Sequence, residues 1–268
     1  MTINSVKKFF VVVLVLTIFC TNLLAQQQAE AVPSNGVSSA EQSDGKTVEW
    51  YLGGSIGWDY LMVKRTEQLT TVDNHQFSFS QNKSRSANGI AGKAIVGFLW
   101  TIPDTAFVLS PEVYWGRINT QITVQESTYD TINNASKQLQ STLRHIRSMG
   151  LVLRGGFYLS NRQNDFLYVL IGFDKSQFEN KYTFSSTDYL TLAVPSTVIK
   201  QRKWSNAPVF GFGFERKFNA FKVGIDLRYI AYPNWRQVSQ KNSVSSDQLA
   251  LRYKPRVITT SLTFCYMF

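Results

Sequence analysis

Cysteine and histidine are scarce in this sequence, which has two of each among 268 residues. Cys20 lies in an amino-terminal segment that we expect to be removed on export, so Cys265 would have no intramolecular disulfide partner. His75 and His145 lack the neighbouring cysteines or carboxylates whose spacing marks a metal site. A glycine-rich loop of the kind that cradles phosphates is also missing. The sequence therefore predicts no metal ion and no cofactor.

A long apolar run occurs at the amino end of the chain. Lys7 and Lys8 precede the apolar residues 9–20, and Ala25 follows after a short spacer. This is the layout of a secretory signal peptide, and the run is short against the roughly 20 residues that a transmembrane helix needs. We interpret residues 1–25 as a signal peptide, cleaved after Ala25 or at a second site ending in Ala31. The protein is expected to be exported.

The next segment, residues 26–47, is polar and has almost no large apolar side chains. It cannot bury enough apolar surface to offset the entropy that ordering costs. We expect this segment to be a disordered leader, followed by one folded domain over residues 48–268.

Acidic residues are outnumbered, with 18 Asp and Glu against 28 Lys and Arg and a formal net charge of +10. Basic residues are spread over the later polar stretches, among them Lys200, Arg202, Lys203, Arg236, Lys241, Arg252, Lys254 and Arg256. Such an excess suits nucleic acid, anionic lipid or lipopolysaccharide, or plain solubility. Export argues against nucleic acid, which leaves contact with lipid and lipopolysaccharide or a merely solvated rim.

Apolar and polar residues alternate with a period of two in eight segments, which is typical of β-strands with two different faces. These segments are residues 49–61, 88–100, 107–115, 148–159, 167–176, 209–215, 221–229 and 257–268. The connections between them are alternately long and short, and the long ones are the polar stretches 64–86, 119–143, 180–202 and 233–253. This pattern predicts an all-β, eight-stranded antiparallel up-and-down transmembrane β-barrel with short periplasmic turns and four long external loops.

Two features indicate that the apolar residues face outward, into lipid, and not inward as in a lipocalin-like carrier. Glycines crowd the polar face, where a narrow lumen needs small residues. Tryptophans gather near the strand ends, with Trp50 and Trp100 on the short-turn side and Trp58, Trp115 and Trp204 on the long-loop side. We expect them to form two aromatic girdles at the membrane interfaces.

The polar face carries charged residues at similar heights, which are Lys93, Glu112, Arg154, Asp174, Asp226 and Arg228. Charges screened from water must be paired, and an eight-stranded barrel is just wide enough for its side chains to fill. The sequence predicts a self-neutralised polar lumen. A gated ion pathway through these residues is the alternative.

The last strand ends on an aromatic residue, with Phe264, Tyr266 and Phe268 on one face. It resembles the assembly signal of bacterial outer-membrane β-barrels. The whole layout resembles the small eight-stranded barrels of the OmpA transmembrane-domain, OmpX and opacity-protein type. That resemblance implies the outer membrane of a Gram-negative bacterium, and contact of the last strand with the barrel-assembly machinery. It also implies roles in envelope stability, adhesion or host interaction, and in a few members enzymatic activity.

We therefore predict a monomeric, non-enzymatic surface barrel that acts through its external loops on a host, a neighbouring cell or lipopolysaccharide. A small-solute, porin-like channel is the first alternative. A lipid A-modifying enzyme is the second, because His145 is expected on the lipid-facing side of the external rim, with Ser141 and Ser148 nearby. Arg147 shares that expected position, so both residues could equally contact lipid headgroups.

Overall fold

The computed structural model describes residues 48–70, 82–103, 105–130, 135–159, 164–188, 194–238 and 248–268. The signal peptide and the leader lie outside these residues and stay predictions. The strands are β1 (Val48–Thr70), β2 (Asn82–Thr101), β3 (Phe107–Asp130), β4 (Ala135–Tyr158), β5 (Asp165–Asp188), β6 (Val194–Phe218), β7 (Phe221–Ala231), β8 (Trp235–Val238) and β9 (Gln248–Met267). Among the described residues, no helix is long and apolar enough to cross a membrane.

The strands form one closed antiparallel sheet. Each of β1 to β6 pairs with the next strand, β7 pairs with β9, and β9 pairs with β1 from Tyr51↔Met267 to Thr70↔Gln248. The four-residue β8 continues the line of β7 along β9, after an interruption at Pro233, which has no N–H to donate to a ladder. If β7 and β8 are counted as one interrupted strand, the sheet has eight strands, and the predicted eight-stranded up-and-down barrel is confirmed.

The polarity of the barrel is inverted relative to a soluble protein. Outward side chains are large and apolar, such as Ile56 and Phe173, which are 64% and 72% exposed, whereas Arg154 inside is 0% exposed. Water would disfavour such an exterior by about 25 cal/mol for each Å² of apolar surface. The apolar face therefore requires lipid, as the sequence analysis predicts, and a lipocalin-like arrangement is excluded.

Two of the short turns have described residues that show them to be tight, as expected. Ile102 N donates to the carbonyl of Phe107 across the β2–β3 turn, at 3.0 Å. Phe218 pairs with Phe221 across the β6–β7 turn, where Asn219 has a left-handed φ of 48°. Asparagine tolerates this conformation better than most side chains do. We place these turns in the periplasm, as in outer-membrane barrels generally.

The strands run far beyond the membrane. Most have 20–25 residues, whereas about 9–11 suffice to span a bilayer. The polar stretches expected as loops mostly continue as strands, because they keep a period of two: Ile122 and Val124 point inward while Gln121 and Thr123 point outward. We call the strand portions beyond the apolar band the extension. Residues 71–81, 131–134, 189–193 and 239–247 at its outer end lie outside the described residues.

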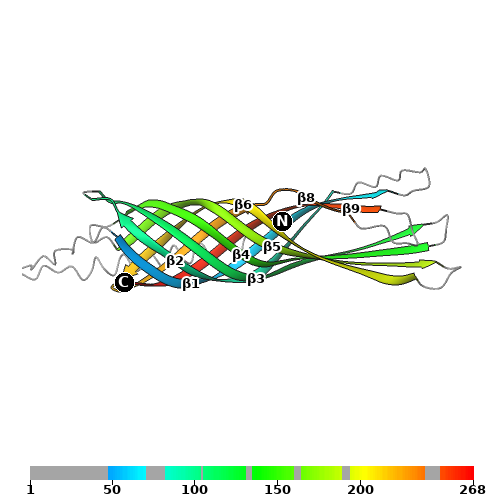
Figure 1. Ribbon diagram of the computed structural model, residues 1–268, viewed down its shortest axis with the longest axis horizontal. Coiled ribbons are helices and arrows are strands. Elements are labelled where there is room, and N and C mark those ends of the chain that lie inside the picture. Colours follow the sequence, from blue (N-terminus) through cyan, green and yellow to red (C-terminus); the bar gives the residue numbers. More distant parts are fainter. Residues whose placement is uncertain are drawn as a thin grey trace, which may run out of the picture. The chain divides into compact units, whose positions relative to one another are not determined.

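The extension divides into two sheets. Pairing between β2 and β3 extends no further out than Ile90↔Asn119, and pairing between β6 and β7 no further than Val209↔Ile230. Beyond these two seams, β3–β4–β5–β6 form one sheet, while β2–β1–β9–β8 form the other. Figure 1 shows the green to yellow strands β3–β6 diverging from the cyan end of β1 and the red β9.

The buried hydrophobic cluster of the barrel continues between the two sheets of the extension. It contains Leu61, Val63, Ile122, Val124, Leu143, Phe178, Tyr182, Trp235 and Tyr253. The hydroxyl of Tyr253 receives a hydrogen bond from Asn180 Nδ2 at 2.8 Å and lies 2.7 Å from that of Tyr182. Burial raises the pKa of the Tyr182 hydroxyl. A cavity of ≈ 10 Å³ remains between the sheets beside Leu143 and Tyr253, which is room for about one water molecule.

Candidate functional site

Tyrosine–glycine pairs set the spacing of the barrel interior. Tyr51, Tyr114 and Tyr168 stand directly opposite Gly97, Gly150 and Gly213 on the neighbouring strands. A Cβ atom at any of these glycines would collide with the facing tyrosine ring. The absent side chain lets each ring lie flat against the wall, so that the hydroxyl groups reach the polar interior.

A network of buried ion pairs fills the periplasmic part of the lumen. Arg154 contacts both Glu112 and Glu215, and Lys222 Nζ lies 3.0 Å from Glu215. Arg228 joins Glu112 at 3.1 Å and Asp226 at 2.9 Å. All six side chains are at most 3% exposed. Carboxylates alternate with cations along this network, so its charges neutralise one another within the wall of the barrel.

The aromatic rings complete the environment of these cations. Lys222 Nζ lies 3.2 Å from the centroid of the Tyr51 ring, and the Arg154 guanidinium lies 4.8 Å from that of Tyr168. Arg228 and Lys93 both lie 5.0 Å from the centroid of Tyr114. Each cation therefore rests on the negative face of a π-system.

The structure brings four of the six predicted lumen residues into this network: Glu112, Arg154, Asp226 and Arg228. Lys93 is buried beside it through Tyr114, and Asp174 belongs to a second cluster. Lys222 and Glu215 were not predicted as members. Both stand on the polar face, but so close to the short β6–β7 turn that the sequence does not place them in the lumen.

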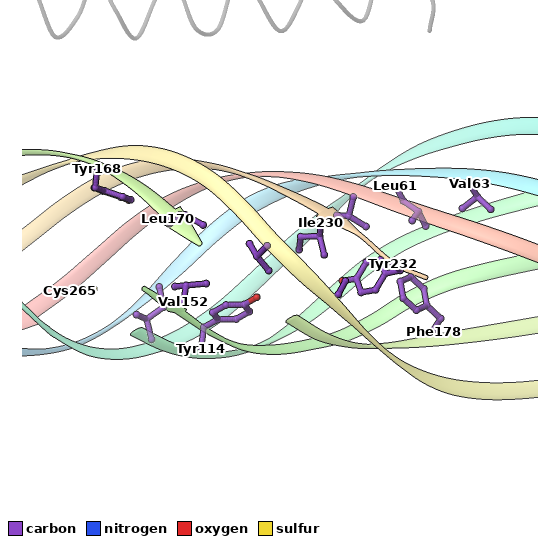
Figure 2. Close-up of a cluster of buried hydrophobic side chains, with 14 of the residues drawn as sticks. Leu61, Val63, Tyr114, Val152, Tyr168, Leu170, Phe178, Ile230, Tyr232 and Cys265 are labelled. Atoms are coloured by element: carbon purple, nitrogen blue, oxygen red, sulfur yellow. The ribbon is translucent and has the colours of Figure 1, made fainter. Parts of the chain in front are cut away.

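The second cluster surrounds His145 at the level where the two sheets of the extension diverge. His145 Nδ1 lies 2.9 Å from Asp59 Oδ2, and Nε2 lies 2.9 Å from Ser176 Oγ. Ser176 Oγ donates to Asp174 Oδ1 at 2.5 Å, and the Tyr232 hydroxyl lies 2.7 Å from both Asp174 Oδ1 and Ser176 Oγ. The His145 ring stacks on Phe178, and Phe178 lies beside Tyr232 (Figure 2). Thr259 adds a hydrogen bond to Asp59 at 2.7 Å.

This position corrects the expectation that His145 faces lipid. The ring is 1% exposed and points into the barrel. The reason is a β-bulge in β4: His145 pairs with Phe178 and Arg147 with Gln177, which leaves Ile146 as an extra residue. A bulge reverses the side-chain alternation beyond it, so His145 turns inward while Arg147 remains exposed.

The Asp59–His145–Ser176 contacts have the order of a serine-hydrolase relay, but not its proton arrangement. The Ser176 hydroxyl donates to the Asp174 carboxylate, and not to Nε2 of His145, which lies 2.9 Å from Ser176 Oγ. A serine whose hydroxyl proton is held by a carboxylate does not present that proton to the imidazole, as activation of a nucleophile requires. All three side chains are buried, at 1% exposure or less. The arrangement links strands rather than exposing a nucleophile.

The predicted girdle residues all lie on the outer surface. Trp50 and Trp100 stand at the short-turn end, and Trp58, Trp115 and Trp204 lie towards the extension. Phe264, Tyr266 and Phe268 are also exposed, and the backbone N–H of Phe268 donates to the carbonyl of Trp50 at 3.0 Å. The remaining tryptophan, Trp235, packs inside the extension against Tyr253.

Charged residues outside the barrel differ between its two ends. At the short-turn end the outward Arg216 is paired, with its Nε 3.4 Å from Asp165. Lys217 and Glu49 stand on the inward-facing side of their strands, and Lys217 Nζ lies 2.5 Å from Glu49 at the mouth of the lumen. At the opposite end, just beyond the apolar band, the outward residues form what we call the external rim. Its described basic residues are Lys64, Arg117, Arg144, Arg147, Lys175, Lys181, Lys200, Arg202, Arg236, Arg252, Lys254 and Arg256.

A single carboxylate, Glu179, lies within the described part of the rim. Arg202 Nε donates to it at 2.7 Å, while Lys200 Nζ and Arg144 Nη1 lie 3.2 and 3.8 Å away. The hydrogen bond from Arg202 is the largest of the effects that lower the pKa of Glu179. One negative charge therefore holds three positive ones in place, and the rim keeps a surplus of positive charge.

No protein-family model matches the sequence, and no curated protein is similar to it. Similar solved structures include the attachment invasion locus protein Ail of Yersinia pestis, at 12% identity and TM-score 0.34 over 82% of this chain and 99% of that one. The outer membrane protease OmpT of Escherichia coli is 10% identical, with TM-score 0.38 over 82% and 97%. OprG of Pseudomonas aeruginosa, an outer membrane protein, is 9% identical, with TM-score 0.39 over 82% and 95%.

With TM-scores this low, none of these structures carries the assignment, which rests on the closed sheet and its apolar exterior. This chain is a transmembrane β-barrel of the outer-membrane type. The structures with which it shares this architecture carry different activities in their names, so the architecture does not assign one.

Proposed function

We propose that the protein is a non-enzymatic surface barrel whose rigid extension presents binding surface to a neighbouring cell or host. The observation that supports this proposal is the extension itself. Along β4, the portion from Arg147 to Ala135 spans about 40 Å. Paired strands with a buried core between them hold this surface in one shape before any partner binds. Such preorganisation lowers the entropy cost of binding.

The lumen supports a structural role over the channel alternative. Its ion pairs cross the barrel, as between Arg228 on β7 and Glu112 on β3. Opening a conducting path would require separating these pairs and leaving charges unpaired in a low dielectric, at several kcal/mol for each one. The mutual neutralisation of the lumen charges therefore favours a barrel whose lumen is filled and closed over one that conducts ions.

The His145 cluster supports the non-enzymatic assignment over a lipid A-modifying enzyme. An enzyme of that kind needs its nucleophile at the lipid-facing rim, whereas Ser176 is 0% exposed and donates its proton to Asp174. Ser141 and Ser148, the other serines considered for this role, also point inward and are hydrogen-bonded to neighbouring side chains.

The test compares the full chain with a variant whose β3–β4 hairpin is shortened. Thr123 and Thr142 are cross-strand partners, so residues 124–141 can be replaced by an Asn-Gly turn. Cells that display the full chain should adhere to one another or to a fixed epithelial monolayer. Cells that display the shortened variant should lose this adherence and keep a heat-modifiable barrel. Equal adherence of both variants, adherence no higher than that of empty cells, or stepwise conductance of the full chain in planar bilayers would overturn the proposal.

A further inference from the structure

The external rim contains cross-strand pairs of like charge. Arg117 stands directly opposite Arg147, and Lys181 directly opposite Lys200. The other sheet repeats the pattern, with Lys64 opposite Lys254 and Arg236 opposite Arg252. Like charges in directly opposed positions destabilise a sheet. Within the described residues only one of these four pairs, Lys181 and Lys200, has a carboxylate beside it, which is Glu179. The other three pairs therefore favour an anion from outside the chain that offsets their repulsion.

The position of these pairs says where the anion comes from. Arg117 follows Trp115 by two residues on the outer face of β3, and Arg256 precedes Ile258 by two on that of β9. The rim thus begins where the apolar band ends, on both sheets. A ligand that fits must carry acyl chains to lie along the band and negative charge at its headgroup, at the height of the rim.

The pairing of charges at the short-turn end argues that the rim is specific to one membrane face. There, the outward Arg216 has the carboxylate of Asp165 as its partner within the chain, so the described outer face meets the periplasmic leaflet with its charge paired. On the described outer face of the rim, Glu179 is the one carboxylate, and it braces Arg202, Lys200 and Arg144. It leaves Arg117, Arg147 and Lys175 for an external partner. Lys175 is further oriented by Trp204, whose ring centroid lies 5.7 Å from its Nζ.

We infer that the external rim binds the phosphate groups of the phosphorylated glycolipid of the outer leaflet, lipid A, with Arg117 and Arg147 as one phosphate clamp. A phosphate between two guanidinium groups accepts charge-assisted, bidentate hydrogen bonds from both, which removes the repulsion between them. The acyl chains of the same molecule pack on the apolar wall below, formed there by Trp115, Met149 and Phe173. This site lies on the wall of the barrel and is separate from the surface-binding role of the extension.

The decisive variant is R117Q/R147Q, and its matched control is R216Q/K217Q, which removes the same charge from the opposite end. Each protein, folded in uncharged detergent, is titrated with bisphosphorylated lipid A, with its dephosphorylated form, with phosphatidylglycerol and with inorganic phosphate. Wild type and control should bind bisphosphorylated lipid A alike. R117Q/R147Q should bind it about tenfold or more weakly, because two charge-assisted contacts are lost. R117K/R147K should fall between them, since lysine keeps the charge and loses the planar fork.

Several outcomes would overturn the inference. They are unchanged binding by R117Q/R147Q, equal affinity of wild type for dephosphorylated lipid A or for phosphatidylglycerol, and saturation by inorganic phosphate at the same concentration as by lipid A. The last result would mean that the rim is a plain anion site. Heat-modifiable mobility of every variant on gels shows that each barrel is folded, so a loss of binding is not a loss of fold.

Discussion

The interior of the barrel and its external rim both carry many arginines and lysines, yet the two regions pair them in opposite ways. Inside, Arg154 and Arg228 share Glu112, and carboxylates alternate with cations. On the rim, Arg117 faces Arg147 and cation stands beside cation. The difference follows from what lies next to each region. The interior has no outside partner and must balance its own charge, whereas the rim borders the headgroup layer, which can supply the missing anion.

The largest effect on stability is expected from breaking the charge balance in the interior of the barrel. Glu112→Gln leaves Arg154 and Arg228 buried with one carboxylate fewer, so the free energy of unfolding should fall by about 3–5 kcal/mol. Glu179→Gln makes the same chemical change on the rim and should cost about 1 kcal/mol or less. Urea unfolding in detergent, followed by tryptophan fluorescence, measures both. Equal losses for the two variants would mean that interior and rim do not differ in this way.

An intermediate effect is expected at the His145 cluster, where the barrel meets the extension. Asp59→Asn removes the carboxylate that accepts from both His145 and Thr259. We expect a loss of about 1–3 kcal/mol, because the buried His145 ring and the Thr259 hydroxyl lose the carboxylate that they contact. The extension should also become more sensitive to trypsin. Thr259→Val, which removes one hydrogen bond and no charge, is the control and should cost less. Identical digestion patterns of Asp59→Asn and wild type would contradict this role of the cluster.

A gain in stability is expected on the rim. Arg117→Glu converts an opposed cation pair into an ion pair with Arg147, so the free energy of unfolding in glycolipid-free detergent should rise by about 0.2–1 kcal/mol. The same variant should bind lipid A less well. R117E/R147E restores like charges and should lose the gain. If Arg117→Glu destabilised the barrel, the opposed arginines would not be repelling each other.

The smallest effect concerns pH. The pKa of Glu179 is lowered in the folded protein, chiefly by the hydrogen bond from Arg202. A lowered pKa means that the carboxylate stabilises the fold above the ordinary pKa of glutamate and that this contribution is lost as the pH falls through the lowered value. A carbon-13 NMR titration of the Glu179 side chain should therefore show a midpoint below that of a free glutamate. Arg202→Gln should raise the midpoint, and an unchanged midpoint would exclude the Arg202 hydrogen bond as the main cause of the lowered pKa.

Strand number, order and sidedness could be predicted from the sequence because they depend on a period-two pattern repeated in every strand. Phe264, Tyr266 and Phe268, for example, share a face whatever their neighbours do. The same pattern failed at His145, since one extra residue in β4 reverses the face of all that precedes it. A bulge leaves no periodic signal of its own, so its position had to come from the pairing of β4 with β5.

Partners within the lumen were less predictable than the presence of charge there. The polar faces of β1 and β5 contain Asp59 and Ser176, but the strand pattern does not say which residue across the barrel each one meets. That depends on the tilt and stagger of the closed sheet. The opposed arginines of the rim were hidden for the same reason. Arg117 and Arg147 become neighbours only through strand register, and Arg117 lies between the expected third strand, 107–115, and the stretch 119–143 that was expected to be a loop.

The continuity of the strands bears on how the molecule would respond to force. An attached cell would pull on the outer end of the extension, along the direction of β3 to β6. Hydrogen bonds between antiparallel strands lie perpendicular to that direction. Such a pull would therefore load many of these hydrogen bonds at once in shear, and would not break them one after another. The two seams end where the closed sheet begins, so the load would pass into strands that are hydrogen-bonded to a neighbour on both sides. In the proposed surface role, a barrel built in this way would be a mechanical anchor as well as a membrane span.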